Sequence, residues 1–284
     1  DGYVALDDAD LHAKAPGAVA VYDRGLTSAS PKAAGPAVQI SKPYFNGITA
    51  AGTPSGEALP EFKLSTSESK ELLKTALHEL HRALGAKMAP FGGWDMPLWY
   101  SSVSVEHAAV RVSAGLFDVS HMGVWEASGA TAAEFLDAVC ANDISALGTG
   151  NSLYTHLFDP DGNVIDDLLV YRHTAQRYLI VVNASNEAKD WAWMNAVLAG
   201  GVLVDRQRPA AQASGRCGVT LRNLRDRAAG ADMRVGLALQ GPQSREVLLG
   251  LDADEATAAL VRTLKRTEVC EATLGGINLI ISRT

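Results

Sequence analysis

The segment Gly85-Ala-Lys-Met-Ala-Pro-Phe-Gly-Gly-Trp-Asp-Met-Pro-Leu-Trp-Tyr100 differs from the rest of the chain in composition. It combines two Trp, a Phe, a Tyr, two Met, two Pro and an adjacent pair of glycines. Pro90 and Pro97 each lack a backbone donor and fix φ, whereas the pair Gly92-Gly93 reaches conformations that other residues avoid. The segment is too apolar for a solvated loop and too interrupted for a helix or a regular strand. Two interpretations are equally open, a rigid loop that covers the core and the wall of a pocket for a flat ligand.

The overall composition is that of a globular protein. The chain has 284 residues, of which 47% are hydrophobic, and its net charge is −7. This acidic balance argues against nucleic acid or an anionic membrane as the main partner. No apolar stretch reaches the roughly 18 residues of a membrane-spanning helix, and we expect no signal peptide. Cys140, Cys217 and Cys270 are widely spaced, which suits a reducing compartment, so we expect a cytoplasmic protein.

The chain divides by composition near residue 65. Residues 1–65 are rich in Ala, Gly, Pro, Ser and Asp, and Gly47 to Pro60 has the character of a linker. We expect 1–65 to be an extension, or the remnant of an upstream module, and 66–284 to form the functional domain. In that domain hairpin patterns stand beside helical ones, which predicts an α+β fold and not a doubly wound sheet.

Periodicity and turn residues place the expected elements. The leucines between residues 72 and 84 recur at helical spacing, Ser104 is a candidate cap, and Thr131-Ala-Ala-Glu134 is a capping-box pattern. The expected helices are 72–84, 104–114, a helix after Thr131, and 189–198. The expected strands are 153–158, 168–171, 178–182, 235–239 and 277–281.

Two motifs that resemble metal sites fail on spacing. His78-Glu79-Leu80-His81 has its second His three residues after the first instead of four, so we expect surface positions on an amphipathic helix. The segment that begins at Asp159 resembles a calcium loop, but Val164 and Val170 stand where Gly and a bidentate Glu are needed. The sequence has no dinucleotide, P-loop or nucleophile-elbow motif either. We therefore expect no metal.

The block Asn142-Asp143-Ile144-Ser145 follows an apolar helical pattern. An ordinary turn at the end of a helix explains it. A carboxylate at the rim of a pocket, with Ile144 and Val139 packed behind it, explains it too, and Asp143 could then bind ring N–H groups or assist proton transfer at an amine. The residues alone favour the turn.

Two further clusters carry charge within apolar sequence. Asp166-Asp167 lies in the strand pattern 164–171, where alternation sends the two carboxylates to opposite faces. A buried carboxylate needs partners, so this pair indicates either a structural network or a site. Asp118, Ser120 and His121 are close in sequence without triad spacing. Met122 beside them is a soft side chain suited to line a pocket.

Distinctive blocks follow one another along most of the chain. They are His78-Glu-Leu-His81, Gly85–Pro97, Glu106-His107, Ala114-Gly-Leu-Phe-Asp-Val-Ser-His-Met-Gly123, Asn142-Asp-Ile-Ser145, Ile165-Asp-Asp-Leu168, Val181-Val-Asn-Ala184, Leu237-Ala-Leu-Gln-Gly-Pro242 and Ser282-Arg-Thr284. In this order they resemble one family, the aminomethyltransferase or T-protein of the glycine cleavage system. The resemblance covers roughly residues 71 to 284, and its collinearity makes it specific.

The resemblance implies a three-domain cloverleaf around a central folate channel. This chain would hold most of the first two domains, ferredoxin-like and mixed α/β subdomains, and would lack the third, a barrel. The implied activity moves a one-carbon unit from the aminomethylated lipoyl arm of the glycine cleavage H-protein to tetrahydrofolate and releases ammonia. Asp143 matches the residue most tied to catalysis in the family, which shifts our interpretation of that site from turn to functional carboxylate. Folate-lining positions of the family correspond to Met122, Tyr154, Val170 and Asn183.

Three departures from the family pattern shape the alternatives. The chain stops at Arg283-Thr284, where the family continues toward further folate-contacting residues. The Arg-rich stretch 205–233 is longer than usual, and a solvated loop is favoured there over a docking surface for an acidic carrier. Residues 1–65 have no counterpart, so we expect a truncated member derived from a fusion protein. The alternative functions are a related folate-dependent demethylase and a non-catalytic folate-binding module fused to another one-carbon enzyme.

Overall fold

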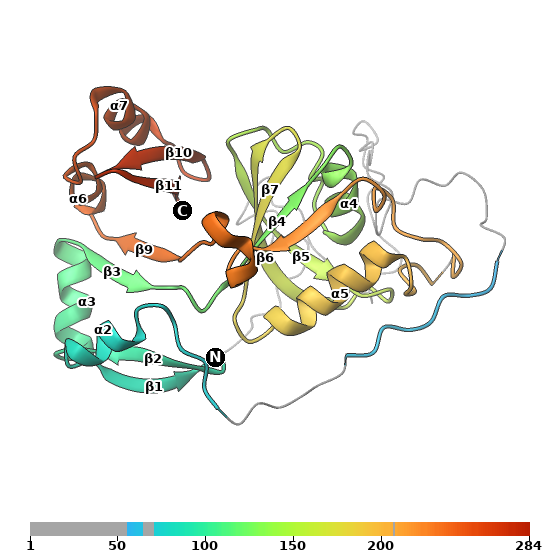
Figure 1. The fold of residues 1–284 in the computed structure, drawn as a ribbon, viewed down its shortest axis with the longest axis horizontal. Coiled ribbons are helices and arrows are strands. Elements are labelled where there is room, and N and C mark those ends of the chain that lie inside the picture. Colours follow the sequence, from blue (N-terminus) through green and yellow to red (C-terminus); the bar gives the residue numbers. More distant parts are fainter. Residues whose placement is uncertain (1–55, 65–70, 207) are drawn as a thin grey trace, which may run out of the picture. The chain divides into compact units, whose positions relative to one another are not determined.

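The computed structural model describes residues 56–64, 71–206 and 208–284 (Figure 1). They belong to one compact unit. Most of the predicted extension 1–65, including most of the linker from Gly47 to Pro60, lies outside the described residues. Among the residues that the structure does describe, no helix has the length and apolar character needed to cross a bilayer.

The described end of the extension, residues 56–64, packs on the domain. Leu59 N donates to Pro209 O at 2.8 Å. The Phe62 ring meets the Trp193 ring edge-on, with centroids 5.4 Å apart. This segment therefore contributes to the core that the sequence assigned to residues 66–284 alone.

A five-stranded antiparallel sheet forms the centre of the domain, in the order β5-β6-β7-β4-β8. Its strands are β4 (Gly123–Ser128), β5 (Ser152–Phe158), β6 (Val164–Thr174), β7 (Arg177–Val182) and β8 (Thr220–Asn223). Hairpins join β5 to β6 and β6 to β7, and every neighbouring pair is antiparallel, so this is the α+β arrangement that the sequence predicts.

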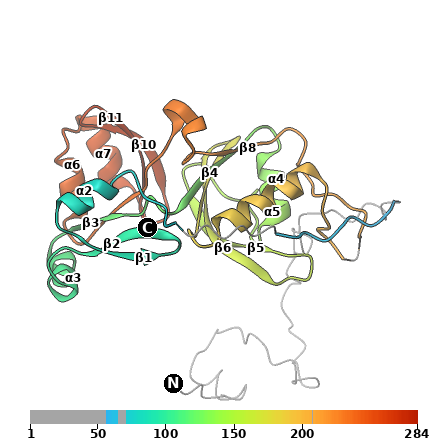
Figure 2. The ribbon, with the colours of Figure 1, turned by 60° about the horizontal axis from the view of Figure 1, so that its bottom comes forward.

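Two helices, α4 (Ala132–Val139) and α5 (Glu187–Ala199), cover one face of this sheet (Figure 2). Between sheet and helices lies the main apolar core, in which Trp125, Phe135 and Ile180 are completely buried and Trp193 is 1% exposed. Each such side chain contributes about 1.5–3 kcal/mol through burial. The opposite face carries no helix from this pair, and we call it the open face.

Smaller elements surround the sheet. They are α2 (His78–Ala83), the hairpin of β1 (Lys87–Phe91) and β2 (Trp94–Trp99), α3 (Val103–Val112), β3 (Gly115–Asp118) paired with β9 (Leu237–Gln240), the 3-10 helix η1 (Arg227–Asp232), α6 (Ser244–Leu249), α7 (Glu255–Thr263), and the hairpin of β10 (Val269–Leu274) and β11 (Ile277–Ser282).

The segment Gly85–Tyr100 is a hairpin with one register shift, between Lys87 and Met88, which corrects the expectation that it is too interrupted for strands. Pro90 faces Asp95 and Pro97 faces Met88 in a two-stranded sheet. Apart from the bridge between Leu73 and Trp94, each strand has one edge without a partner strand among the described residues, so a missing N–H is tolerated there. Gly92 and Gly93 form the turn with φ of 56° and 84°, in the left-handed region that favours glycine.

The two histidines of α2 are buried, not exposed as expected. His78 is 2% exposed, and its Nε2 lies 2.8 Å from Asp95 Oδ2, which raises the pKa of His78. His81 is 6% exposed and lies 2.8 Å from Asp118 Oδ2. The leucine spacing overestimated the helix, because residues near Leu73 pair with β2 instead. These partners come from distant strands, so local periodicity does not reveal them.

Two predicted helix caps differ in the structure. Ser102, not Ser104, caps α3 by accepting a hydrogen bond from Val105 N at 3.3 Å. Thr131 makes no cap hydrogen bond to α4. Its hydroxyl lies 2.7 Å from Gly215 O, so it ties the start of α4 to a distant loop.

The Arg-rich stretch 205–233 is partly regular structure, which corrects the expectation of a solvated loop. It contains β8, which pairs with β4, and η1. Arg206 pairs with Asp161 and Glu61, and Arg208 pairs with Asp205. These charges are neutralised within the chain, which argues against a cationic docking surface there.

Candidate functional site

The open face gathers several predicted residues in one row. Across the sheet, Tyr154 pairs with Leu169, Leu169 with Val181, and Val181 with Val124. Because side chains alternate along a strand, residues two positions away share this face. Those residues are Met122, His156, Asp167 and Asn183.

Hydrogen bonds join three residues of this row. The Tyr154 hydroxyl donates to Asp167 Oδ2 at 2.7 Å, and this bond raises the pKa of Tyr154. Asn183 Nδ2 lies 3.2 Å from Asp167 Oδ1 and 3.1 Å from Asp167 O. The Tyr154 side chain is 56% exposed, so its ring is available to a flat ligand.

Asp143 approaches this row along the outer edge of β5. Cys140 forms a bridge with Leu157, Ala141 N donates to His156 O at 2.9 Å, and Asn142 N lies 3.2 Å from Thr155 Oγ1. If this register continues by one residue, Asp143 comes level with Tyr154.

The Asp143 carboxylate combines the two roles that the sequence left open. Its Oδ1 accepts a hydrogen bond from Ala146 N at 3.0 Å, as a turn residue would. Its Oδ2 receives no hydrogen bond from the part of the chain that the structure describes. The loop is held firmly, because Ile144 is completely buried and Asp137 Oδ1 accepts from Ile144 N at 2.6 Å. One oxygen of a well-positioned carboxylate therefore remains for a ligand.

The Gly85–Tyr100 hairpin borders the same end of the sheet. A Cβ added to Gly92 would lie 3.5 Å from the Ala184 Cβ, and Ala184 follows Asn183 directly. Met122, which is partly buried, precedes β4 at a position level with Asn183. The hairpin turn therefore lies beside the segment that carries Asn183.

Arg225 fastens this hairpin to the sheet. Its guanidinium lies 4.7 Å from the centroid of the Trp94 ring, and it donates to His121 O at 2.6 Å. It also pairs with Glu187 at the start of α5. The Phe91 ring meets the His121 ring edge-on at 5.6 Å. Burial, with the nearby Arg225, lowers the pKa of His121.

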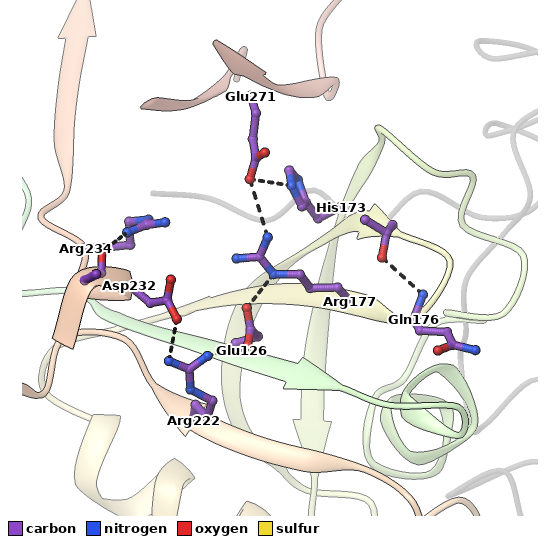
Figure 3. A network of polar contacts seen from close by, with 10 residues as sticks. Glu126, His173, Gln176, Arg177, Arg222, Asp232, Arg234 and Glu271 are labelled. Atoms are coloured by element: carbon purple, nitrogen blue, oxygen red, sulfur yellow. Dashed lines mark hydrogen bonds and ion pairs between the residues drawn. The ribbon is translucent and has the colours of Figure 1, made fainter. Parts of the chain in front are cut away.

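The other end of the open face is closed by ion pairs (Figure 3). Glu126 is 4% exposed and accepts hydrogen bonds from Arg177 Nε at 2.5 Å and Arg222 Nη1 at 3.2 Å. Glu271 of β10 lies 2.7 Å from His173 Nε2 and 3.4 Å from Arg177 Nη1. The hairpin of β10 and β11 is thereby tied to the sheet at this end.

Val170 is not brought to this site. It pairs with Leu153 and Ile180, so its side chain lies on the face that α4 and α5 cover, where it is completely buried. No ligand on the open face meets this side chain while the core is intact. Its assignment to the folate pocket receives no support from the geometry.

The sequence missed one residue beneath the site, Asp190. Its side chain is completely buried and lies against Asp166, which is 5% exposed. Burial and the hydrogen bond with Asp166 raise the pKa of Asp190 to about 8. Burial opposes ionisation of Asp166 as well, but hydrogen bonds from Asp190, Asn183 and Asn186 outweigh it and lower the pKa of Asp166. Asp190 stands three, four and seven residues before Trp193, Met194 and Val197, so helical spacing already assigns it to the buried stripe of α5.

Comparison with known proteins identifies relatives over most of the chain. The family model described as the GCVT N-terminal domain matches residues 77–284. The aminomethyltransferase of Desulforamulus reducens is 41% identical over 215 residues, which are 76% of this chain and 51% of that protein. The aminomethyltransferase of Bacillus subtilis is 41% identical over 75% of this chain and 51% of its own length.

A solved structure supports the same relationship. The crystal structure of glycine cleavage system aminomethyltransferase T from Bartonella henselae matches with a TM-score of 0.57 and 32% identity. The match covers 71% of this chain and 48% of that one. The chain thus spans about half the length of the curated relatives it matches.

Proposed function

Because the chain belongs to the family of the GCVT N-terminal domain, we propose that it is the folate-binding part of an aminomethyltransferase. Tetrahydrofolate is the co-substrate, and an aminomethylated lipoyl arm on an H-protein is the donor. The chain acts in the cytoplasm, within a cloverleaf that a third, barrel domain completes.

One observation carries this proposal, the grouping of Met122, Tyr154 and Asn183 at one end of the open face, toward which the segment before Asp143 runs along the edge of β5. The Tyr154 ring offers a flat apolar surface, and Met122 adapts to a ring edge. Asn183 and Asp143 offer oxygen acceptors for ring N–H groups. A pterin ring combines a flat surface with several N–H donors, which suits this set. Val170 supports the sheet from behind, through the core.

Asp143 contributes to the reaction through its charge and position. The one-carbon unit forms bonds to two folate nitrogens while its bonds to the amine nitrogen and the lipoyl sulfur break. The two protons that leave the folate nitrogens go to ammonia and to the thiol of the reduced lipoyl arm. A fixed carboxylate favours the positive charge that develops on the attacking folate nitrogen. Side chains packed around the ring exclude water, which would otherwise release formaldehyde.

Asp143→Asn tests this role. We expect the rate of ammonia and methylenetetrahydrofolate formation from an aminomethylated H-protein to fall by about 10²–10⁴-fold, the usual range for a group that assists proton transfer. Tetrahydrofolate affinity should change by less than about tenfold, because only one acceptor is altered. Stopped assays for ammonia and calorimetric binding measure the two quantities.

The exposed Asp252→Asn removes the same charge elsewhere and should change neither quantity. Tight folate binding by the unmodified chain without any turnover would favour the non-catalytic folate-binding module instead. No folate binding at all would remove the proposal for this chain.

A further inference from the structure

Two carboxyl groups lie beneath the open face, inside the core. Asp166 of β6 is 5% exposed and Asp190 of α5 is completely buried. Asp166 Oδ1 is well supplied with donors, because Asn186 Nδ2 lies 2.6 Å away and Asn183 Nδ2 lies 3.2 Å away.

Three other oxygens of this pair lack a donor. Asp166 Oδ2, Asp190 Oδ1 and Asp190 Oδ2 are buried, and no N–H or O–H group of the described residues reaches them. An unpaired buried charge is far more costly than a neutral group, and two adjacent carboxylates repel each other. A single proton held by Asp190 and donated to Asp166 relieves both costs.

The surrounding charges favour this arrangement. Asp167, on the same strand as Asp166, adds negative charge on the other face of the sheet. Among the described residues, the cation that acts on Asp190 is Lys189, and it is engaged elsewhere, because its Nζ donates to Ile165 O at 2.6 Å and to Asn186 Oδ1 at 3.1 Å. Lys189 weakens the preference for the neutral form of Asp190 without cancelling it.

The pair acts on the open face through Asn183. The Asn183 amide nitrogen lies between Asp166 Oδ1 below the sheet and Asp167 Oδ1 on the open face. This fixes which way the amide is turned, and within the described chain its Oδ1 has no partner. That oxygen is left to accept a hydrogen bond from a ring N–H.

We propose that Asp190 is a positioning residue of the folate site: as a neutral carboxylic acid it donates to Asp166, and Asp166 holds the Asn183 amide ready for the ligand. The proposal rests on the folate-binding function proposed above. Loss of the proton leaves two repelling carboxylates beneath Asn183, so folate affinity should fall as Asp190 ionises.

The experiment compares the unmodified chain with Asp190→Asn and the control Asp252→Asn. The asparagine amide is neutral at every pH and still donates to Asp166. Carboxyl ¹³C spectra and the Asn183 side-chain amide signal are recorded from about pH 6 to about pH 10, together with tetrahydrofolate affinity.

In the unmodified chain we expect one aspartate to titrate near pH 8 and the Asn183 amide signal to shift with it. Affinity should fall by up to about tenfold per pH unit above that point, since the competent protonation state becomes scarcer by that factor. Asp190→Asn should keep affinity within about threefold at neutral pH and lose the pH dependence. Asp252→Asn should behave like the unmodified chain.

Two results would overturn the proposal. One is an unmodified chain in which no buried aspartate titrates above about pH 6, a measurement that needs no variant to fold. The other is an equal pH dependence of affinity in the unmodified chain and in Asp190→Asn. If no form binds tetrahydrofolate, the proposed function fails on its own. The Asn183 amide signal then tests the contact between Asp190 and Asp166. A signal that titrates only in the proteins that contain Asp190 supports this contact, and any other behaviour refutes it.

Discussion

Asp166 and Asp167 are neighbours in sequence but lie in two different environments. Asp166 points to the helix-covered face, where it is 5% exposed and lies against the buried Asp190. Asp167 points to the open face, where it accepts a hydrogen bond from the partly exposed Tyr154. The pleat of one strand thus divides two like residues between support and contact. The two faces differ in role at this level of the sheet: the helix-covered face holds the main core, and the open face exposes polar side chains, while a second, smaller core packs around Leu224 further along it.

The largest change in stability is expected for Trp125→Ala on the helix-covered face. Trp125 is completely buried between the sheet and α5, where its ring centroid lies 5.1 Å from that of Trp191. Its loss leaves a cavity, so we expect the free energy of unfolding to fall by about 3–5 kcal/mol. Urea denaturation followed by circular dichroism measures this value. A decrease below about 1 kcal/mol would contradict the division of roles between the faces.

A pH-dependent effect should follow from Asp190→Asn when the free energy of unfolding is measured against pH. The folded-state pKa of Asp190, about 8, lies above its usual value of 3.8. The folded state therefore binds more protons between these values, and stability falls as pH rises through this window. Within this window, each pH unit lowers the free energy of unfolding by up to about 1.4 kcal/mol through this one residue.

Asp190→Asn should remove that slope, so its stability relative to the unmodified chain should rise from about pH 5 to about pH 8 and then level off. Asp252→Asn, which removes an exposed charge, should keep the slope of the unmodified chain. Parallel curves for all three proteins would show that Asp190 is ionised throughout.

The smallest effect on stability is expected for Tyr154→Phe on the open face. The ring remains and only the hydrogen bond to Asp167 is lost, at a position that is 56% exposed. The free energy of unfolding should change by no more than about 0.5 kcal/mol. A thermal melt measures this, and a loss as large as that of Trp125→Ala would erase the contrast between the two faces.

The sequence predicts the fold class well because the sheet follows local alternation. The strands of the central hairpins and the buried position of one of the two carboxylates at Asp166-Asp167 agree with the structure. The family was recognisable from ordered blocks such as Asn142-Asp-Ile-Ser145, and the match over residues 77–284 confirms it. The assignments of Asp143, Met122, Tyr154 and Asn183 to a folate site stay predictions.

What the sequence did not reveal depends on contacts between distant segments. His78 and His81 are buried because Asp95 and Asp118 meet them from other elements. Thr131 has the residue type of a cap, but carbonyl groups near Gly215 attract its hydroxyl instead. Asp190 is different, since its place on the apolar stripe of α5 was visible in the spacing.

The pairing of β8 with β4 has a consequence for how the chain folds. Trp125 lies opposite Asn223 in this ladder. In sequence, three other strands and two helices lie between β4 and β8. During synthesis, β4 must leave one edge unpaired until β8 emerges. Exposed strand edges recruit other chains, and non-local pairings of this kind slow folding. Pairing of β8, which lies in the Arg-rich stretch, therefore completes the sheet. A nascent chain that ends before this stretch keeps the edge of β4 unpaired and is most prone to aggregate.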